Sequence, residues 1–411
     1  MRARLLVVVL MLLVTLGCES YRGERGILVG AIYPTGGSQG PGGTEEYRGV
    51  TLAAEYANQQ GGVHGRPIRL ALERADTSDA VPSAVERLTA AGARVLVGSY
   101  GSTISQPVAK LASERGLMFW ETGAVGEFGM QVSSGERVFR FAPTGAALGR
   151  AAVIFVRDQL TPRTKHPQPL RYAVVYVNDV YGRAVAIGAI AVLLESHLPL
   201  VARLPYDVAH VDYEALVRRI VSARVDVLVV AAYLDDGVKL RRAIVHAKVP
   251  LVASIGTSSS YCHPAFGRLL GPDAVGLFAS DKPDGEGLRP DRLSPEGAEA
   301  LKWATAEYRR RFHEPMSAAA LAGFAGGWAL FHHVFPQATD LTPAAVALAA
   351  QKTHLPEGSL PNGAGLAFAP PGGPDAGANV LASTVIWEWV KVETRAIVWP
   401  TMFATHPLVF P

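Results

Sequence analysis

The feature that most constrains the fold of this chain is a repeated alternation of short apolar runs with amphipathic stretches of helical period. The run Ile27–Ile32 predicts a strand, and the stretch Glu46–Gln60 carries apolar residues from Val50 to Ala57 at the three- and four-residue spacing of a helix. Further strands are predicted at Ile68–Glu73, Val95–Gly98, Leu117–Trp120, Tyr172–Val177, Val227–Ala231 and Leu251–Ile255. Helices are predicted at Ser83–Ala91, Pro107–Arg115, Ala146–Gln159, Gly182–Ser196, Asp212–Ala223 and Gly237–Ala247. Strands that alternate with helices form a parallel sheet with helices on both faces, so the expected fold class is α/β.

The alternation is about twice as long as one doubly wound domain needs, which suggests two lobes. Breaks in the pattern fall at Phe141–Thr144, Ser280–Pro283 and Leu355–Gly358. Three breaks would let the chain visit each lobe twice and so build a hinge. The pattern alone does not distinguish that arrangement from two successive domains.

The N-terminus has the three-part layout of a secretory signal. Arg2 and Arg4 precede the apolar run Leu5–Leu16, which Gly17 and Cys18 close. The run is too short to cross a bilayer, which takes about 20 residues, so residues 1–18 are expected to be a signal peptide. The Thr-Leu-Gly-Cys ending resembles a bacterial lipoprotein processing site, which implies a lipid on Cys18. The alternative is ordinary signal cleavage without a lipid.

Composition describes an exported, well-packed globular protein. The chain is 49% hydrophobic and 18% charged, and its net charge of +3 comes without a basic block interleaved with aromatics, which excludes a nucleic-acid partner. It has 2 cysteines, so a lipid on Cys18 leaves Cys262 alone and excludes both an internal disulfide and a cysteine-based structural zinc site. A buried or pocket-lining thiol is favoured for Cys262 over a reactive pair with His263.

No catalytic constellation is found. A Gly-x-Ser-x-Gly nucleophile turn is absent from any strand–turn–helix context, and no Gly-Lys-Ser/Thr follows the glycines at Gly40–Gly43. The histidines His64, His210 and His263 lack triad-like or zinc-spacing neighbours. The protein is therefore expected to be no enzyme and to need no cofactor or metal ion.

Several segments, in order, resemble one family. They are Gly26–Gly43, Asn58–Ile68, Gly98–Thr103 with Gln106 and Pro107, Val177–Gly182, Leu360–Gly363 and Val398–Pro400. The chain resembles the type I periplasmic binding proteins, in the branch that binds leucine, isoleucine and valine for ABC importers. The resemblance implies two doubly wound parallel-sheet lobes joined by a three-segment hinge, with a first lobe of residues 27–142 and 283–354 and a second lobe of residues 143–282 and 355–411.

The resemblance also places the ligand between the lobes, at loops that follow the strands. Ser102 and Thr103 precede a helix expected to begin near Gln106, and a helix N-terminus with short hydroxyls is a ready site for a carboxylate. The alternative is that these hydroxyls only cap the helix. From the second lobe, Tyr181 and Tyr233 fall where the family has aromatic contacts.

Two departures from the family pattern bear on the ligand. The loop Thr257–Tyr261, with Ser259 as a candidate contact, has hydroxyls where the family holds an α-ammonium with an acid. After the strand ending at Trp120, Glu121 is inserted beside the candidate contact Gly123. Glu121 either takes over the cationic end of the ligand or pairs with an arginine such as Arg140. The expected ligand is an amino-acid derivative, an amide or a polyol-like compound instead of leucine.

The predicted function is that of an extracytoplasmic substrate-binding lipoprotein of an ABC importer, which captures a small polar ligand such as an amino acid, an amino-acid-like compound or an amide. Its partners would be the ligand, a membrane-embedded permease with its ATPase, and the membrane through the lipid anchor. The alternative is a ligand-sensing receptor subunit of the same fold that feeds a membrane signalling system.

Overall fold

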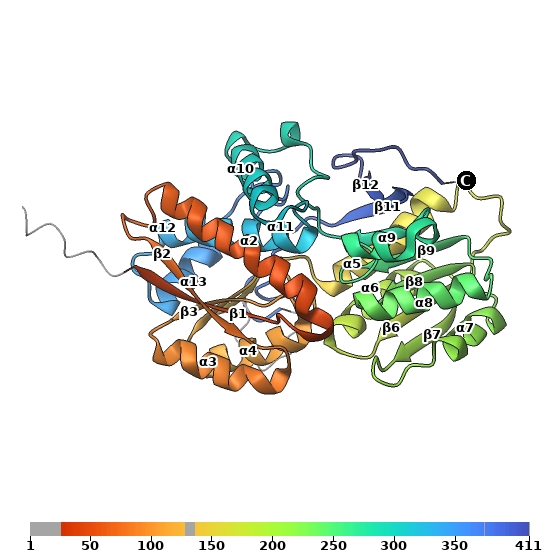
Figure 1. Cartoon of the computed structure of the whole chain (residues 1–411), viewed down its shortest axis with the longest axis horizontal. Helices are drawn as coiled ribbons and strands as arrows, with labels where there is room; N and C mark the ends of the chain where they lie inside the picture. Colours follow the sequence, from red (N-terminus) through yellow and green to blue (C-terminus); the bar gives the residue numbers. More distant parts are fainter. Residues whose placement is uncertain (1–25, 128–135, 374, 411) are drawn as a thin grey trace, which may run out of the picture.

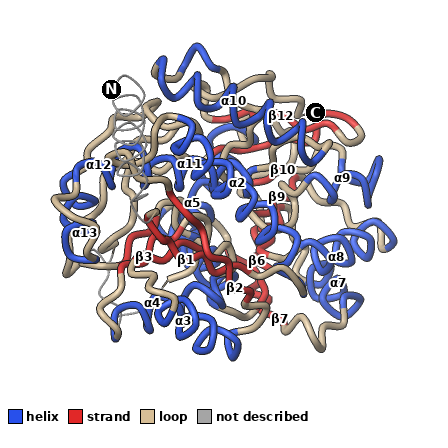
Figure 2. Tube along the Cα trace, turned by 60° about the vertical axis from the view of Figure 1, so that its left-hand side comes forward, coloured by secondary structure: helices blue, strands red, loops and turns tan. Residues whose placement is uncertain are grey.

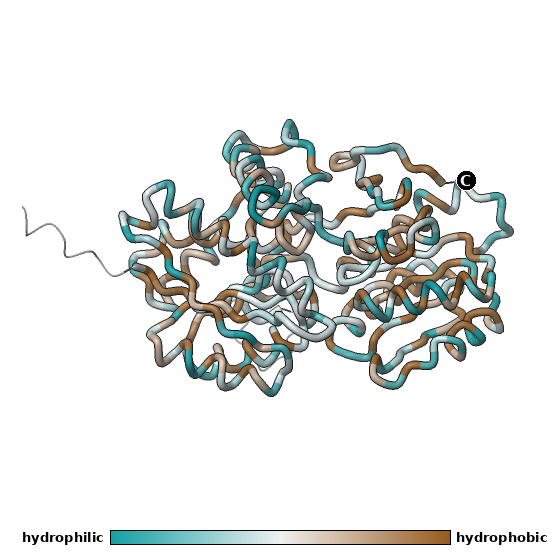
Figure 3. Tube along the Cα trace, viewed as in Figure 1, coloured by the Kyte–Doolittle hydropathy of each residue, from teal (hydrophilic) through white to brown (hydrophobic). Residues whose placement is uncertain are grey.

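The computed structural model describes residues 26–127, 136–373 and 375–410, which form two α/β lobes lying side by side (Figure 1). The predicted leader and Cys18 lie outside the described residues. Two sheets of five and seven strands, mostly parallel, form the centres of the lobes. Apolar segments run through the strands of both lobes (Figure 3). The predicted α/β fold class is confirmed.

The first sheet is parallel throughout, in the order β2-β1-β3-β4-β5. Its strands are β1 (Ile27–Tyr33), β2 (Ile68–Arg74), β3 (Val95–Gly98), β4 (Met118–Glu121) and β5 (Val138–Arg140). Both β3 and β4 are buried along their whole length, as expected for central strands covered on both faces. Their carboxyl ends therefore meet at one edge of the sheet, where Gly98 lies beside Glu121.

The second sheet has the order β12-β11-β10-β9-β8-β6-β7. Its strands are β6 (Tyr172–Val177), β7 (Leu200–Tyr206), β8 (Val227–Ala231), β9 (Ala253–Thr257), β10 (Phe278–Asp281), β11 (Val385–Lys391) and β12 (Thr394–Trp399). The strands from β6 to β10 are parallel, whereas β11 and β12 join antiparallel. The carboxyl ends of β9 and β10 bring Thr257 beside Ser280.

Helices surround both sheets (Figure 2). In the first half of the chain they are α2 (Gly40–Gln59), α3 (Val81–Ala90), α4 (Ser102–Glu114), α5 (Gly145–Phe155), α6 (Val180–Glu195), α7 (Tyr213–Ser222) and α8 (Leu234–His246). They are followed by α9 (Pro264–Leu270), α10 (Pro295–Phe312), α11 (Ala318–Trp328), the π-helical turn η6 (Ala329–Val334), α12 (Phe335–Gln337) and α13 (Pro343–Lys352).

Glycines allow α2 and α11 to cross in direct backbone contact. A Cβ on Gly49 would lie 1.9 Å from the Ala320 carbonyl oxygen, and one on Gly323 would lie 2.0 Å from the Glu46 carbonyl oxygen. The run Ala318–Gln337 is long and apolar enough to cross a membrane, but 89% of its most apolar window is buried inside the protein. It is a core helix of the first lobe.

The chain passes between the two sheets three times: after β5, after β10 and before β11. Between the second and third passages it packs against the first sheet. The Trp120 indole N–H donates to the Gly326 carbonyl at 3.0 Å, and Phe368 meets the Trp120 ring edge-on at 5.2 Å. A bridge between Arg140 and Ala378 then precedes β11. Three connecting segments at one place form the hinge.

Several elements differ from the sequence prediction for local reasons. Helix α2 begins at Gly40 instead of Glu46. Its first turn packs closely on Pro34, and only a glycine fits at Gly43, because a Cβ there would lie 2.2 Å from the Pro34 carbonyl oxygen. Helix α4 begins at Ser102 and runs through Pro107. Strand β5 has only three residues, and β7 lies at the edge of its sheet and contains Pro205, so neither shows a clear strand pattern.

Candidate functional site

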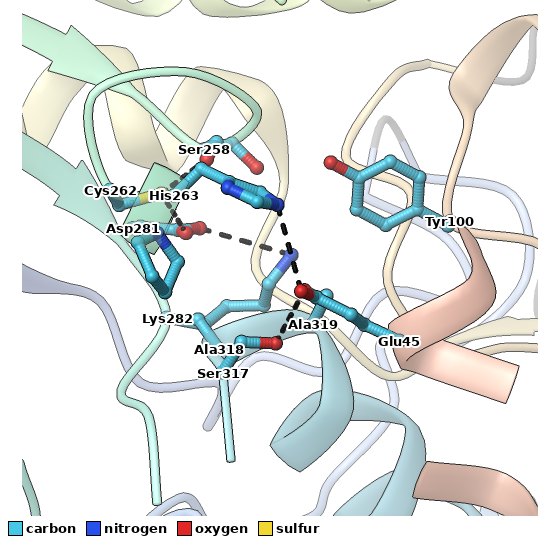
Figure 4. Close-up of a pocket in the computed structure, with 11 residues that line it drawn as sticks. Glu45, Tyr100, Ser258, Cys262, His263, Asp281, Lys282, Ser317, Ala318 and Ala319 are labelled. Carbon is cyan, nitrogen blue, oxygen red and sulfur yellow. Dashed lines mark hydrogen bonds and ion pairs between the residues drawn. The ribbon is translucent and has the colours of Figure 1, made fainter. Parts of the chain in front are cut away.

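A small polar cavity lies between the lobes, near the hinge (Figure 4). Its volume is about 20 Å³, which is room for about one water molecule, so the lobes are closed on each other here. It is lined by Glu45, Tyr100, Ser258, Cys262, His263, Pro264, Asp281, Lys282, Ser317, Ala318 and Ala319. These residues come from α2, the loop before α4 and the start of α11 on one side, and from the segments after β9 and β10 on the other.

Asp281 and Lys282 form the charged floor of the cavity. Both are only 2% exposed, and the Lys282 ammonium lies 3.8 Å from Asp281 Oδ1 and donates to the Gly123 carbonyl at 3.1 Å. The Cys262 thiol donates to Asp281 Oδ2 at 2.6 Å, while Asp281 Oδ1 has no hydrogen-bond partner. Burial raises the pKa of Cys262 well above its usual value, so the thiol stays protonated. The expected buried, pocket-lining thiol is confirmed.

Glu45 and Ser317 of the first side meet His263 of the second side in the cavity (Figure 4). Glu45 Oε2 accepts from the Ser317 hydroxyl at 2.6 Å, and Glu45 Oε1 lies 3.7 Å from His263 Nε2. His263 Nδ1 accepts the Ala265 N–H at the start of α9, which places the ring proton on Nε2. Burial lowers the pKa of His263 to about 4 and raises that of Glu45. The imidazole is therefore neutral at pH 7, and its Nε2–H, which has no hydrogen-bond partner, faces a carboxylate.

Tyr100 reaches from the first lobe toward the second. Its backbone is left-handed, with φ 64°, a conformation that costs a residue with a Cβ about 1–2 kcal/mol. Its ring packs on Gly42, where a Cβ would lie 2.1 Å from Cζ. Burial raises the pKa of its hydroxyl, which interacts with the Ser259 side chain and lies near Cys262. The strained backbone thus aims an uncharged phenol across the cleft.

Glu121, at the end of β4, holds the neighbouring loops together. Its Oε1 accepts the backbone N–H groups of Ser99 at 3.0 Å, Gly123 at 3.0 Å and Ala124 at 2.6 Å. Arg140 forms an ion pair with Glu127, at 3.2 Å. Glu121 therefore joins the loops after β3 and β4.

A second buried carboxylate, Glu46, lies beneath the same loop. Its Oε1 accepts from the Thr122 hydroxyl at 2.6 Å, and a Cβ on Gly123 would lie 1.7 Å from its Oε2. Burial is the largest cause of a raised pKa at both Glu46 and Glu121, and each has an Oε2 without a hydrogen-bond partner. The charge of Glu121 further raises the pKa of Glu46, so the pair favours keeping a proton.

The other predicted first-lobe contacts lie at the mouth of the cleft. Ser102 is the first residue of α4, and its hydroxyl accepts the Gly126 N–H at 3.0 Å. Thr103 Oγ1 accepts a hydrogen bond from the Gln39 side-chain amide at 2.6 Å. A Cβ on Gly126 would lie 2.7 Å from Val180 Cγ1 at the start of α6. The first lobe therefore touches the second directly at this point.

The two predicted tyrosines lie together in the second lobe. The rings of Tyr181 and Tyr233 are 5.4 Å apart, and both side chains are almost fully buried. The Tyr181 hydroxyl is 2.9 Å from Thr257 Oγ1, and the Tyr233 hydroxyl donates to Asp179 Oδ2 at 2.6 Å. Tyr233 also lines a groove at the rim of the cleft with Gln39 of the first lobe.

Sequence reasoning missed most of the cavity lining. Tyr100 stood inside the loop quoted for the family, but its left-handed backbone is not visible in a sequence. Asp281 and Lys282 fell in a predicted break and were treated only as hinge. Glu45 lies in α2, one residue before the predicted start of the helix at Glu46. In the sequence, the adjacent opposite charges of Asp281 and Lys282 were the available signal for a charged group in the cavity.

Comparisons with known proteins agree with this architecture. A family model for periplasmic binding proteins matches residues 26–376. The chain is 24% identical over 349 residues to "Leu/Ile/Val-binding protein homolog 8" of Brucella abortus (strain 2308), covering 82% of this chain and 83% of that protein.

Solved structures share the fold. A leucine-binding protein from Thermotoga maritima has a TM-score of 0.75 at 16% identity, over 90% of this chain and 97% of that one. A branched-chain amino acid transporter substrate-binding protein from Streptococcus pneumoniae, in complex with isoleucine, has a TM-score of 0.72 at 18% identity, over 92% and 100%. The match of the family model to most of the chain implies a binding protein, not an enzyme, that works outside the cytoplasm. The chain belongs to the periplasmic binding protein family.

Proposed function

We propose that the protein is the substrate-binding component of an ABC importer and captures one amino acid or amino-acid-like compound between its lobes. The observation that carries this proposal is the inter-lobe cavity, where charged and polar side chains of both sides meet and some of their buried atoms have no partner. The names of the relatives, which refer to leucine, isoleucine and valine, support the same class of ligand.

The charges of the cavity suit a zwitterion or an amide. Asp281 Oδ1 is a buried acceptor without a hydrogen bond, so an ammonium or amide N–H there would remove a penalty of about 1–3 kcal/mol. Lys282 donates one N–H to Gly123 and has two more for an anionic group. Asp281 and Glu45 would then supply the acidic contact that the loop Thr257–Tyr261 lacks.

Of the residues predicted from sequence, we propose Ser102, Gly123, Tyr181, Tyr233 and Ser259 as ligand contacts once the lobes open to admit a ligand. Each lies on a loop or helix start at the carboxyl end of a strand, on one or the other side of the cleft.

We assign positioning roles to Glu121 and Thr103. Glu121 already accepts backbone N–H groups through Oε1, and Thr103 holds the Gln39 amide. The acid that contacts the ligand is therefore Asp281 instead of Glu121.

We further propose lobes that follow the predicted limits at residues 142 and 282. The third crossing is placed near residue 382 instead of 355, because Phe368 packs on the first-lobe residue Trp120 and β11 begins at Val385. The leader ending in Gly17-Cys18 supports a lipid on Cys18, which would hold the protein beside its permease and ATPase.

A thermal-shift screen of amino acids, amides and polyols tests the function. At 100 times Kd, a ligand that binds only the folded state adds about 2.7 kcal/mol to the free energy of unfolding, a readily measured rise in Tm. Ser102→Ala and Tyr181→Ala should each reduce the rise for the responding compound. If no compound raises the Tm, or both variants respond as the wild type does, the assigned cleft is wrong.

A further inference from the structure

A cluster of metal-ligating side chains lies outside the inter-lobe cavity. It consists of Glu296, in the first turn of α10, and His332 and His333, in the π-helical turn η6. None of the three lines the cavity between the lobes. The cysteines and the spacing of the histidines in the sequence predict no zinc site. Glu296 and His332 are 36 positions apart in the chain. The fold brings them together.

The three side chains converge on one point. One potential ligand atom from each lies within 4.8 Å of the others. His332 Nε2 is 2.6 Å from Glu296 Oε1, and the two imidazole rings stand edge to face, with centroids 5.1 Å apart. Both histidines lie in the π-helical turn η6, where the backbone departs from the roughly 100° step between consecutive residues of an α-helix. Such π-helical turns are common at functional sites.

His333 offers a ring nitrogen without a hydrogen-bond partner to a metal ion. Its Nε2 is buried without a hydrogen-bond partner, which costs about 1–3 kcal/mol for a polar atom. Nothing else among the described residues satisfies this nitrogen.

The indole of Trp328 fixes the orientation of both rings. It stacks on His332 at 5.0 Å with an interplanar angle of 15°, and meets His333 edge-on at 4.6 Å. Glu296 and His332 remain accessible, with side chains 57% and 31% exposed. An ion could therefore reach the cluster from solvent without unfolding the helix.

We propose that Glu296, His332 and His333 bind one divalent transition-metal ion of the zinc class. Two imidazole nitrogens and one carboxylate oxygen form a ligand set that zinc accepts, with a fourth position left for water. Zinc–nitrogen bonds of about 2.0–2.1 Å require the side chains to draw together, and the hydrogen bond between His332 and Glu296 gives way to two bonds to the ion. The site would pin α10 to η6 within the first lobe.

Calorimetric titration of Zn²⁺ into tag-free, chelator-treated protein at pH 7.5 tests the proposal. We expect one ion bound per chain. His332→Ala and His333→Ala should each weaken binding by more than about tenfold, because loss of even an outer-shell partner weakens metal sites by roughly 10- to 100-fold. The exposed His354→Ala is the matched control and should bind as the wild type does.

Glu296→Gln and His332→Ala change partly exposed side chains, so they keep the test valid if His333→Ala fails to fold. A Co²⁺-loaded wild type should show the visible absorption of a four- or five-coordinate site, and both variants should lose it. The proposal is overturned if the wild type binds no ion, or if the variants at Glu296, His332 and His333 bind Zn²⁺ as the wild type does.

Discussion

Replacing Gly126 by valine is expected to weaken ligand binding by about 10- to 100-fold, because the new side chain would hold the lobes apart. A Cβ at this position would lie 2.6 Å from Ser102 Cβ in the first lobe and 2.7 Å from Val180 Cγ1 in the second. Overpacking of this kind costs about 1–3 kcal/mol, and each 1.4 kcal/mol is a factor of ten in affinity. The clash with Val180 exists only in the closed form, so that part of the penalty falls on closure, whereas the clash with Ser102 lies within the first lobe and is present in both forms.

Calorimetry on the compound found by the thermal screen gives the affinity, and small-angle scattering gives the radius of gyration. We expect the wild type to contract when the ligand binds and Gly126→Val to stay extended, with a free energy of unfolding lowered by about 1–3 kcal/mol through the clash with Ser102. Gly373→Ala is the matched control, because a Cβ there meets no atom within 4 Å. Contraction and full affinity in Gly126→Val would show that closure at this contact is not needed.

Replacing Glu46 by glutamine is expected to flatten the pH dependence of stability. Burial raises the pKa of Glu46 above its usual value of 4.5, so the folded protein holds a proton that the unfolded chain releases. The free energy of unfolding therefore falls as the pH rises from about 4.5 through the folded pKa. Each unit of pKa shift corresponds to about 1.4 kcal/mol, so the wild type should lose up to a few kcal/mol across this range.

Urea unfolding between pH 5 and 8 measures this effect. Glutamine resembles the protonated carboxyl in shape and can donate a hydrogen bond, so Glu46→Gln should lose less stability than the wild type as the pH rises, and the remaining loss is that of Glu121, whose pKa burial also raises. Glu86→Gln, a change on the exposed face of α3, should follow the wild-type slope. Parallel slopes for Glu46→Gln and the wild type would mean that Glu46 is ionised in the folded protein.

Much of the fold could be predicted from the sequence because its signals are local. Buried runs such as Val95–Gly98 and Val227–Ala231 became strands with the predicted limits. Antiparallel β11 and β12 were missed, because they follow a long irregular segment and join the sheet through contacts distant in sequence. The predicted helix begins at Glu46 and so leaves out Gly40–Gly43, the start of α2, because the close packing of Gly43 against Pro34 is visible only in three dimensions.

The candidate site was harder to predict than the fold. Ser102 and Tyr181 could be named because the resemblance to the family places ligand contacts at these positions, on loops that follow predicted strands. The acids in the cavity could not, because Asp281 ends β10, a strand that the sequence pattern does not predict, and Glu45 lies in α2 just before the predicted start of the helix at Glu46. Glu121 was recognised as unusual, but its backbone hydrogen bonds depend on loop geometry that the sequence does not contain.

Calorimetric titration of the responding compound into the wild type and Asp281→Asn tests the central claim most directly. If the ligand places an ammonium or amide group against Asp281 in the inter-lobe cavity, binding should be 1:1, and the variant should bind about tenfold or more weakly, since a hydrogen bond to a charged group contributes about 1.5–3 kcal/mol. Asp273→Asn, outside the cavity in the 3-10 turn Gly271–Ala274 that follows α9, should bind as the wild type does. Equal affinities for Asp281→Asn and the wild type would contradict capture of the ligand at this site.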